Sequence, residues 1–467
     1  MARDKKVDDV VILGGGVCGL YAARRLTAEG FSVSVVEKEC FLGGLAAGIK
    51  IGQNFYDQGV HMLHEHDREI YEDCMAMMGD ESVSVELKAR IRWQGRFYRY
   101  PLQFGDMIKG MPPLTLGRAV AGLFLAQIRN KVAPWEPRNC EEALIQLYGR
   151  ALYHYFFEDF THRYWGRHPS RISAMFVKRK MPRLTAVDAI KKLLGHIGLR
   201  EKGGRAVESA LLSETLHYSA TGSEALPRCI AERVRKDGAR FFTNSSVRSI
   251  KVEDGRIRSV NIFNSQAGRR RTLPCKHVIS TIPVTTLVAS LRPHVNGDIM
   301  DSCNYLQWLP IAIYGLLVKK DKVMDALYTY YRHRVFHRVG EPKNAGLKVT
   351  PEGHTVLIVE MTCQEGDEKW TGADEMRSRV VSDLEKEGIC REEDIVEMNL
   401  IRNRYAYPVF SLGYEPHYEK LMSCLAGIEN LQSIGRQGGF TFPGMHSAMR
   451  MGASAADQIL NNQMSNK

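Results

Sequence analysis

The chain has 467 residues, 44% of them hydrophobic and 25% charged, and its formal net charge at pH 7 is +11. This composition is that of a globular protein with enough chain for a large core shared between two lobes. The ten cysteines include no C-x-x-C pair and no cysteine–histidine cluster, so we expect no metal site, no redox pair and a reduced, cytoplasmic setting. No segment has the ~18 uninterrupted apolar residues of a membrane-spanning helix, and the polar start of the chain contains no signal-peptide core.

Residues 8–38 have the pattern of a strand, a helix and a second, parallel strand. A glycine turn joins the first strand to the helix. In such a unit Gly14 permits the tight turn, Gly16 lets a pyrophosphate approach the backbone, and Gly19 lets the helix pack on the strand. Glu37, at the end of the second strand, is placed to accept hydrogen bonds from ribose hydroxyls and disfavours a 2′-phosphate. The pattern predicts a Rossmann-type dinucleotide-binding unit.

A second glycine pair, Gly43 and Gly44, follows in the segment FLGGLAAG. A domain that binds only a nicotinamide dinucleotide would continue here with an ordinary helix. Two adjacent glycines instead allow the main chain to lie against a longer cofactor. The sequence contains no additional G-x-G-x-x-G turn, which disfavours a separate NAD(P)H site. The glycine pair therefore favours a flavin dinucleotide.

Residues 114–199 carry apolar residues at helical spacing, which predicts a mostly helical insert. Its first helix, LTLGRAVAGLFLAQI, contains Arg118 and Gln127 and fits either a helix that lies on a membrane or a core helix. The pattern favours the core helix.

From Arg163 to Arg205 there are twelve lysines and arginines and only two acids. Arg163, Arg167, Arg179 and Arg183 are candidates for holding an anionic substrate, and a solvated helical face is the alternative. Nucleic acid is disfavoured as a partner, because no recognised module interleaves exposed aromatic residues with this basic segment.

The second half of the chain is rich in predicted strands. They occupy residues 239–260, around an Asp-Gly turn, then residues 276–283, and then two segments between residues 354 and 409 that a charged helix separates. A last strand enters a glycine turn within residues 429–439, and residues 444–460 form a helix of small residues. Because α/β segments stand at both ends of the chain, we predict a discontinuous cofactor domain.

These segments together resemble the FAD-binding superfamily of amine oxidases, protoporphyrinogen oxidases and phytoene desaturases. NFYDQGVHMLH is similar to its F-D-x-G-x-H loop, SSVRSIKVEDGRI to the strand that meets adenine, VISTIP to the strand that re-enters the cofactor domain, and IGRQGGFTFPGMHSAMRMGASAAD to its closing motif. The resemblance implies FAD as cofactor. The implied FAD-binding residues are Gly14, Gly16, Gly19, Glu37, Lys38, Gly43, Gly44, Leu45, Asp57, Gly59, Val247, Gly435, Arg436 and Met445.

The resemblance implies roles for individual residues near the flavin. His61 is the polar side chain expected nearest the ring, and a loop histidine satisfied by backbone groups is the alternative, since hydride transfer needs no side-chain base. Met445 and His446 are expected to present a backbone N–H to a pyrimidine oxygen. Arg436 is expected to pair with the pyrophosphate, and a structural salt bridge is the alternative.

The middle of the chain most resembles the UDP-galactopyranose mutases of this superfamily. The resemblance lies in GRFYRYPL, YFFEDFTHRYWGRHPSRIS, RVFHRVGEPKNAG and RYAYPVFSLGYE, and it implies Tyr407 as a substrate-binding residue. The chain departs from the mutases where they hold a diphosphate. IYGLLVKKDK has lysines but no arginine, and Phe440 and Phe442 replace tyrosines. These departures disfavour mutase chemistry but not the shared architecture.

The predicted fold class is α/β, with a discontinuous Rossmann-type FAD-binding domain, a helical insert and a strand-rich substrate domain. We assign residues 1–80, 211–295 and 411–467 to the FAD-binding domain, residues 81–210 to the helical insert and residues 296–410 to the strand-rich domain.

The first functional hypothesis is an FAD-dependent oxidoreductase that takes hydride from an organic, anionic small molecule to flavin N5, with the substrate between the cofactor domain and the helical insert. The second is a nucleotide-sugar mutase that uses reduced FAD without net redox change. The third is a non-catalytic flavoprotein at a membrane, in which the net positive charge provides a peripheral membrane contact.

Overall fold

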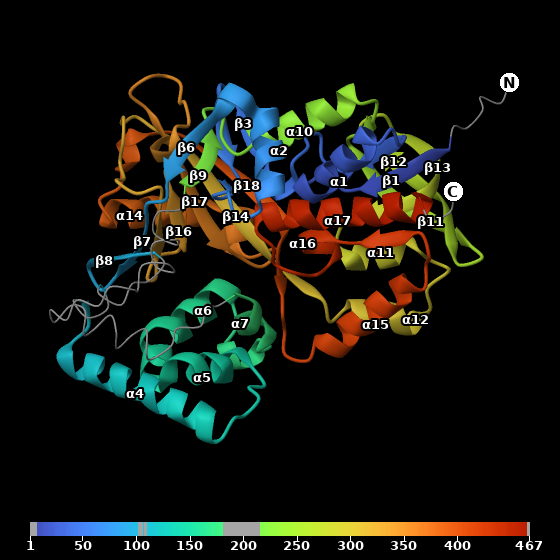
Figure 1. The fold of residues 1–467 in the computed structure, drawn as a ribbon. Helices are drawn as coiled ribbons and strands as arrows, with labels where there is room; N and C mark the ends of the chain where they lie inside the picture. Colours follow the sequence, from blue (N-terminus) through green and yellow to red (C-terminus); the bar gives the residue numbers. More distant parts are fainter. Residues whose placement is uncertain (1–6, 101–105, 107–109, 181–214, 465–467) are drawn as a thin grey trace.

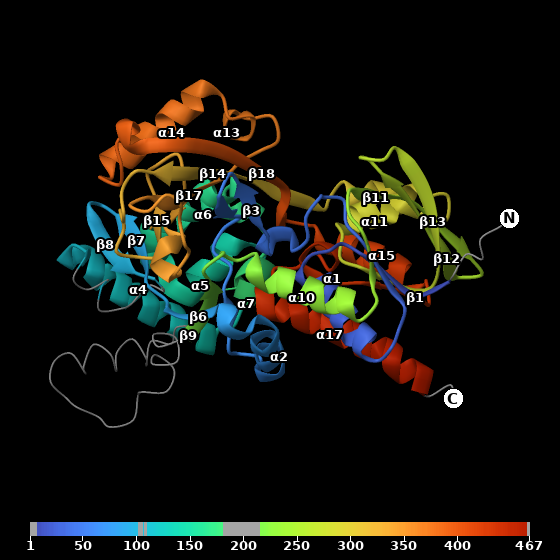
Figure 2. The ribbon, with the colours of Figure 1, turned by 90° about the horizontal axis from the view of Figure 1, so that it is seen from above.

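The computed structural model describes residues 7–100, 106, 110–180 and 215–464, with the backbone alone at residues 179, 180 and 464. Figure 1 shows a cofactor lobe with the chain ends on one side, a second lobe built on another sheet, and a group of helices below the second lobe. Figure 2 shows the same two lobes from above, with α1 (Val17–Ala28) and α17 (Met445–Met464) lying between the second lobe and the outer strands of the cofactor lobe. The α/β class is confirmed.

The cofactor lobe is built on a seven-stranded sheet. The parallel pairing of β1 (Asp8–Leu13) with β2 (Val33–Val36) confirms the strand–helix–strand unit predicted for residues 8–38. β13 (Arg269–Ser280) re-enters beside β1, and β19 (Leu431–Ser433) pairs with β13, so strands from both ends of the chain share the sheet. The strands, in spatial order, are β10 (Arg240–Phe242), β2 (Val33–Val36), β1 (Asp8–Leu13), β13 (Arg269–Ser280), β12 (Arg256–Asn264) and β11 (Ser245–Glu253), with β19 (Leu431–Ser433) beside β13.

Helices cover both faces of this sheet. Val10 and Ile12 of β1 face one hydrophobic core, whereas Val11 and Leu13 face the other, as the alternation of a strand requires. The first core is completed by α1 (Val17–Ala28), α2 (Arg68–Met78), α10 (Ala225–Lys236) and α17 (Met445–Met464). The second is completed by α11 (Val284–Ser290), α12 (Gly297–Cys303) and α15 (Glu415–Ala426).

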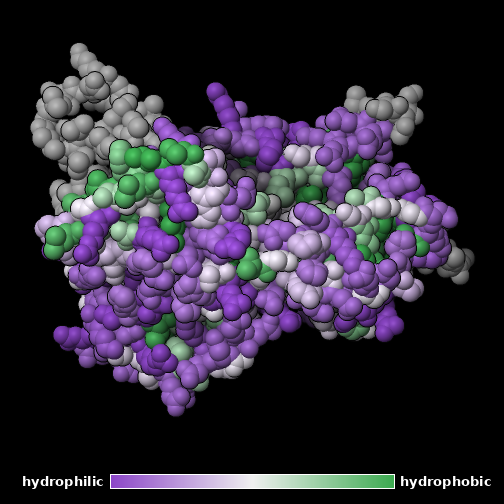
Figure 3. Space-filling view, turned by 90° about the horizontal axis from the view of Figure 1, so that it is seen from below, coloured by the Kyte–Doolittle hydropathy of each residue, from purple (hydrophilic) through white to green (hydrophobic). Residues whose placement is uncertain are grey.

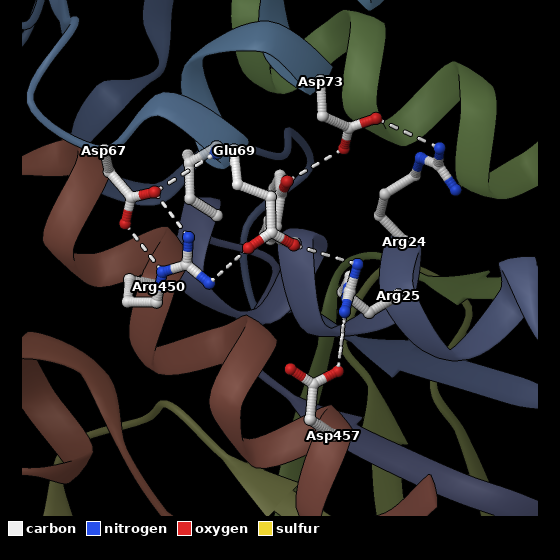
Figure 4. Close-up of polar contacts among 9 residues, drawn as sticks. Arg24, Arg25, Asp67, Glu69, Asp73, Arg450 and Asp457 are labelled. Atoms are coloured by element: carbon white, nitrogen blue, oxygen red, sulfur yellow. Dashed lines mark hydrogen bonds and ion pairs between the residues drawn. The ribbon is translucent and has the colours of Figure 1, made fainter.

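A network of ion pairs joins the last helix of the chain to the first two (Figure 4). Arg450 on α17 pairs with Asp67 and with Glu69, 2.9 Å away, and Arg25 on α1 pairs with Glu69 and with Asp457 on α17. Asp67 is also the N-cap of α2, because its side chain accepts a hydrogen bond from the Ile70 amide. The network therefore ties the two ends of the discontinuous domain together.

Acid should weaken this network. The Arg450 guanidinium, together with the Ile70 amide, lowers the pKa of Asp67 below its usual value in the folded protein. A carboxyl with a depressed folded pKa contributes stability above its unfolded pKa, and that contribution is lost as the pH falls through the folded pKa.

We expect Asp67→Asn to remove this part of the acid dependence in urea unfolding followed from neutral to acid pH. Glu368→Gln, at an exposed ion pair, serves as the control and should leave the acid dependence unchanged. An unchanged pH profile for Asp67→Asn would refute this assignment.

The second lobe is a mostly antiparallel sheet with α14 (Asp374–Lys386) and the short α13 (Glu368–Thr371) on one face. Its strands, in spatial order, are β18 (Ile395–Val409), β14 (Gln307–Val318), β17 (Thr355–Thr362), β16 (Arg338–Gly340), β15 (Tyr328–Tyr331), β7 (Ala89–Trp93) and β8 (Arg96–Arg99). β7 and β8 thus join this sheet, although the sequence suggested helical character for residues 81–210.

Two small sheets connect the lobes. β3 (Gly48–Ile51) pairs with β4 (Asn54–Asp57), and β9 (Thr215–Ser219) lies between β5 (Leu63–His64) and β6 (Ser82–Glu86). The strand β4 leads into the loop that carries His61.

The helical insert contains α4 (Pro113–Val132), α5 (Cys140–Leu152), α6 (Glu158–Trp165) and α7 (Met175–Lys180). The short α16 (Gly435–Gly438) belongs to the cofactor lobe. The prediction that residues 114–128 form a core helix is wrong, because only Ala119 and Leu123 of α4 are buried. α4 and α5 approach so closely that a Cβ at Gly149 would lie 2.5 Å from the Gly122 oxygen. Small residues on one side of α4 therefore suffice for packing, and the larger apolar residues remain outside.

Candidate functional site

The first glycine turn has the shape that a dinucleotide requires. Gly14 has φ +102°, and a Cβ there would lie 2.3 Å from Thr281 Oγ1. A Cβ on Gly19 would lie 2.2 Å from the Gly14 oxygen, so Gly19 allows the helix to pack on the turn. Gly16 is the N-cap of α1 and has no side-chain cap, and no acidic residue lies in the first helical turn. The α1 N-terminus thus has free amide donors and a positive dipole for a phosphate.

The second glycine pair lies directly against this turn. The Gly43 amide donates to the Gly15 oxygen at 2.8 Å, and Gly16 and Gly43 form a parallel bridge. Gly43 and Gly44 both have positive φ, which favours glycine. A Cβ on Gly44 would lie 3.1 Å from the Gly16 Cα. The two glycine segments therefore form one strip of bare main chain, which fits an extended dinucleotide.

Glu37 follows β2 and is hydrogen-bonded to the first residue of β11, the strand that carries Val247. The Glu37 carboxylate accepts hydrogen bonds from the amides of Gly15, at 2.7 Å, and Glu39, at 2.9 Å, and burial raises its pKa. The Ser245 amide donates to the main-chain carbonyl oxygen of Glu37. The register of β11 against β12 shifts between Val247 and Ser249. Such a bulge frees main-chain groups from the ladder, which fits a backbone contact between Val247 and a base.

The C-terminal motif packs on the same helix. Gly435 has φ +78°, and a Cβ there would lie 3.1 Å from the Cys18 sulfur. A Cβ on Gly452 of α17 would lie 2.2 Å from the Cys18 oxygen. Met445 is the first residue of α17, so its amide lies at a helix N-terminus. Both ends of the chain therefore meet at the dinucleotide turn.

Three other predicted cofactor residues have partners within the protein. Asp57 is buried between Tyr218 and the Ser223 amide, and burial raises its pKa to about 6. Lys38 is largely exposed and pairs with Glu39 at 2.9 Å. Leu45 is half-buried in the turn Gly44–Ala46. Asp57 thus holds the strand β4 against residues 218–223, and its contact with a cofactor remains a prediction.

His61 lies, partly buried, in the loop after β4, and Gln58 of the same loop donates a hydrogen bond to the Gly44 carbonyl oxygen. The Nδ1 atom of His61 is buried without a hydrogen-bond partner, whereas the ring has a backbone hydrogen bond with Gly59, whose φ is +113°. Burial, together with Arg436 and Arg338 nearby, lowers the pKa of His61 to about 3. The ring is therefore neutral near pH 7 and offers one unused nitrogen, which fits a hydrogen bond to a bound molecule.

A buried ion pair that the sequence analysis missed lies next to His61. Arg338 on β16 forms a fork with Glu360 on β17, with N–O distances of 2.5 and 2.6 Å. Burial by itself would lower the pKa of Arg338, but Glu360 raises it well above its usual value. The sequence contained one indication of this pair. Glu360 is the one charged residue of the segment TVLIVEMT, and a carboxylate within such an apolar strand requires a cationic partner when the strand is buried.

Arg436 is a second, partly buried cation in this cluster, but no described acidic residue pairs with it. It donates to the carbonyls of Pro443, at 2.9 Å, and Ala406, at 3.4 Å. Its guanidinium lies 4.7 Å from the ring centre of Phe442 and 5.9 Å from that of Tyr407. Burial lowers its pKa, with Tyr407 and Tyr164 opposing the shift. The salt-bridge alternative is therefore not seen among the described residues, and the predicted pairing with pyrophosphate remains a prediction.

Aromatic side chains from three segments surround Arg436. Tyr407 stacks on Phe442 with ring centres 5.2 Å apart, and Tyr164 lies 5.7 Å from Tyr407. Tyr164 also lies against His337, whose Nε2 is buried without a partner. The predicted substrate residue Tyr407 thus lies near Arg338 and Arg436, and the same two arginines lie near His61.

Of the four arginines proposed in the basic segment, the two whose side chains the structure describes, Arg163 and Arg167, do not converge. Arg163 is exposed and donates to the Arg334 oxygen, whereas Arg167 donates to Ser411 and Gln307. The Arg179 side chain and Arg183 lie outside the described residues. The lysines of IYGLLVKKDK lie past the end of β14, and Lys320 pairs with Asp394.

Comparison with known proteins identifies related chains. The family described as flavin containing amine oxidoreductase matches residues 17–460. The dTDP-fucopyranose mutase of Escherichia coli is 23% identical over 230 residues, 45% of this chain and 60% of that protein. The chain therefore matches less than two thirds of that relative's length.

Two solved structures show the same fold. A reduced UDP-galactopyranose mutase superposes with a TM-score of 0.80 and 19% identity, covering 98% of this chain and 94% of that chain. A putrescine oxidase bound to putrescine superposes with a TM-score of 0.63 and 16% identity, covering 98% of this chain and 99% of that one. No helix in the described parts of the chain has the length and apolar character needed to cross a membrane.

Proposed function

The chain belongs to the flavin containing amine oxidoreductase family, and from this premise we propose that it oxidises a small organic molecule that carries one anionic group. Its cofactor is FAD, and the bare main chain at Gly16, Gly43 and Gly44 and the free α1 N-terminus fit that molecule. When bound, FAD supplies the acceptor for the two electrons that a substrate loses.

The observation that carries the proposal is the charge balance beside His61. Arg338 is neutralised by Glu360, whereas the partly buried Arg436 has only carbonyl and aromatic partners among the described residues. Desolvating a cation without an anion costs free energy, and a bound anionic group would offset that cost. One uncompensated guanidinium matches one substrate carboxylate or a similar single anion.

The other side chains of the cluster position the substrate. His61 is neutral, so its free Nδ1 serves as a hydrogen-bond partner and not as a cation. Tyr407, Phe442 and Tyr164 form an aromatic wall that excludes water from the reacting atoms. The residues thus bind and orient a substrate, which is the protein's part in a flavin reaction.

A nucleotide-sugar mutase is the second candidate, and the cluster of tyrosines and arginines at Tyr164, Tyr407, Arg338 and Arg436 favours it. The charges oppose it. A sugar nucleotide carries a diphosphate with two negative charges, and Glu360 already takes the charge of Arg338. A mutase would need a further cation from outside the described cluster.

Anaerobic reduction of the flavin tests the proposal. We expect matched pairs of amines with and without a carboxylate to differ, with the carboxylate-bearing member bleaching the flavin band of the holoenzyme faster. Arg436→Met should raise the KM for that substrate by about 30-fold or more, since losing a charged hydrogen-bond partner costs roughly 2–5 kcal/mol. Arg391→Met, on the far surface of the second lobe, is the matched control and should not change the KM.

Two results would refute the proposal. The first is a holoenzyme that no anionic organic compound reduces. The second is a protein that, after chemical reduction of its flavin, binds and isomerises a uridine diphosphate sugar, which would establish the mutase instead. The flavin content of Arg436→Met must be measured as well, because a loss of FAD would assign Arg436 to the pyrophosphate.

A further inference from the structure

The outer face of α4 carries exposed apolar side chains at its first turn and over its second half. Leu114 is 81% exposed, Leu125 64% and Val132 79%, and Phe124 and Ile128 are also exposed. Leu125, Ile128 and Val132 follow one another at three- and four-residue intervals, and Leu114 precedes Leu125 by about three helical turns, so these four residues share one side of the helix. Figure 3, which shows the molecule from below, shows hydrophobic residues gathered on the side where Figure 1 places α4. Apolar residues of this size rarely lie together in water without a function.

The opposite side of α4 fixes this face in place. Ala119 and Leu123 are buried in a core shared with Leu144 and Tyr148 of α5, and Gly122 meets Gly149. The helix is therefore held rigidly by its inner side. Its outer side has no partner within the described part of the chain.

The charges on α4 all have one sign. The helix contains Arg118, Arg129 and Lys131 and no acidic residue, and all three cations are exposed. Among the described residues none of them forms an ion pair. The outer face therefore combines large apolar side chains with a local charge of three positive units.

We propose that α4 docks the protein on the surface of an anionic lipid bilayer, with the helix lying in the plane of the interface. Leu114, Leu125 and Val132 would enter the acyl boundary, and the three cations would meet lipid phosphates and carboxylates. A second copy of the chain fits this face less well, because pairing two such helices would bring their cations together without an acidic partner.

Vesicle binding of the full-length holoenzyme tests the docking. The probes are vesicles of phosphatidylcholine alone and of phosphatidylcholine mixed with phosphatidylserine. We expect binding to the mixed vesicles that high salt weakens. Since each cation near an anionic surface contributes about 1 kcal/mol, the serine lipid should raise the affinity by roughly 100-fold.

Variants assign the binding to α4. Leu125→Glu with Ile128→Glu changes only exposed positions, and it should lower the affinity for the mixed vesicles at least tenfold while the flavin content stays the same. Val396→Glu is the matched control, because Val396 is an exposed valine on the distant β18, and it should bind like the parent protein. Replacing Arg118, Arg129 and Lys131 by Ser should remove the preference for the serine lipid.

Three outcomes would overturn the proposal. The first is that the parent protein fails to bind the mixed vesicles. The second is that the variant with Leu125→Glu and Ile128→Glu binds them as tightly as the parent. The third is that no vesicle binding occurs and light scattering shows a dimer of the parent protein but a monomer of this variant, which would make this face an interface between copies.

Discussion

Replacing Glu360 by Leu should lower the free energy of unfolding by about 3–5 kcal/mol, the cost of leaving one member of a buried ion pair without its partner. The Glu360 side chain is fully buried, and it accepts two short hydrogen bonds from Arg338. Leu retains most of the volume and removes the charge. The Arg338 guanidinium would then have the Tyr330 hydroxyl, 3.3 Å away, as its remaining polar partner in this contact.

Guanidinium chloride unfolding of the holoenzyme measures this effect. Glu368→Leu is the matched control, because Glu368 pairs with Arg379 in the same lobe but both side chains are more than half exposed. Its cost should be about 1 kcal/mol or less. The double variant Arg338→Met with Glu360→Leu should recover much of the lost stability, because it removes both charges. A Glu360→Leu protein as stable as the Glu368→Leu protein would show that the fork is not a buried pair in solution.

Gly452→Ala should push the last helix of the chain away from the first and so weaken FAD binding, because the contact lies at Cys18, inside the glycine turn. The new Cβ would lie 2.2 Å from the Cys18 oxygen and 3.1 Å from the Ala22 amide. These are backbone atoms within α1, so they cannot move without moving the helix whose N-terminus faces the phosphates. Overpacking of this kind costs typically about 1–3 kcal/mol.

The ratio of flavin to protein after purification, together with thermal unfolding, measures this prediction. Gly117→Ala is the matched control, since Gly117 also lies within a helix, α4, and a Cβ there meets no atom within 4 Å. It should retain FAD and gain up to about 1 kcal/mol, because Ala is the better helix former. Equal flavin content in the two variants would contradict a role of α17 in shaping the cofactor site.

The cofactor lobe was largely predictable from the sequence. The turn around Gly14, Gly16 and Gly19, the strand ending at Glu37 and the Asp-Gly hairpin between β11 and β12 all appear as expected. Their signals are local, because a positive φ, a missing Cβ or a period of two or 3.6 residues constrains neighbours along the chain. The family of the chain was recognisable for the same reason.

The partners of isolated charges were not predictable in this way. Arg338 and Glu360 lie 22 residues apart on two strands, and their contact depends on the antiparallel register of β16 and β17. Among the proposed arginines, Arg163 and Arg167 have separate partners on the surface of the second lobe. A count of basic residues does not say which of them a fold will bury.

The face of α4 shows the same division. Residues 114–128 are recognisable as an apolar helix from the sequence, because periodicity and composition are properties of the segment. Which side of that helix is covered was decided only by the tertiary structure, where the close approach of Gly122 to Gly149 covers the small residues and leaves Leu125 and Val132 outside. In general, the sequence of this protein determined the elements and the dinucleotide turn through local backbone constraints. The tertiary structure decided which charges and apolar faces are compensated, because burial depends on neighbours that are distant in the chain.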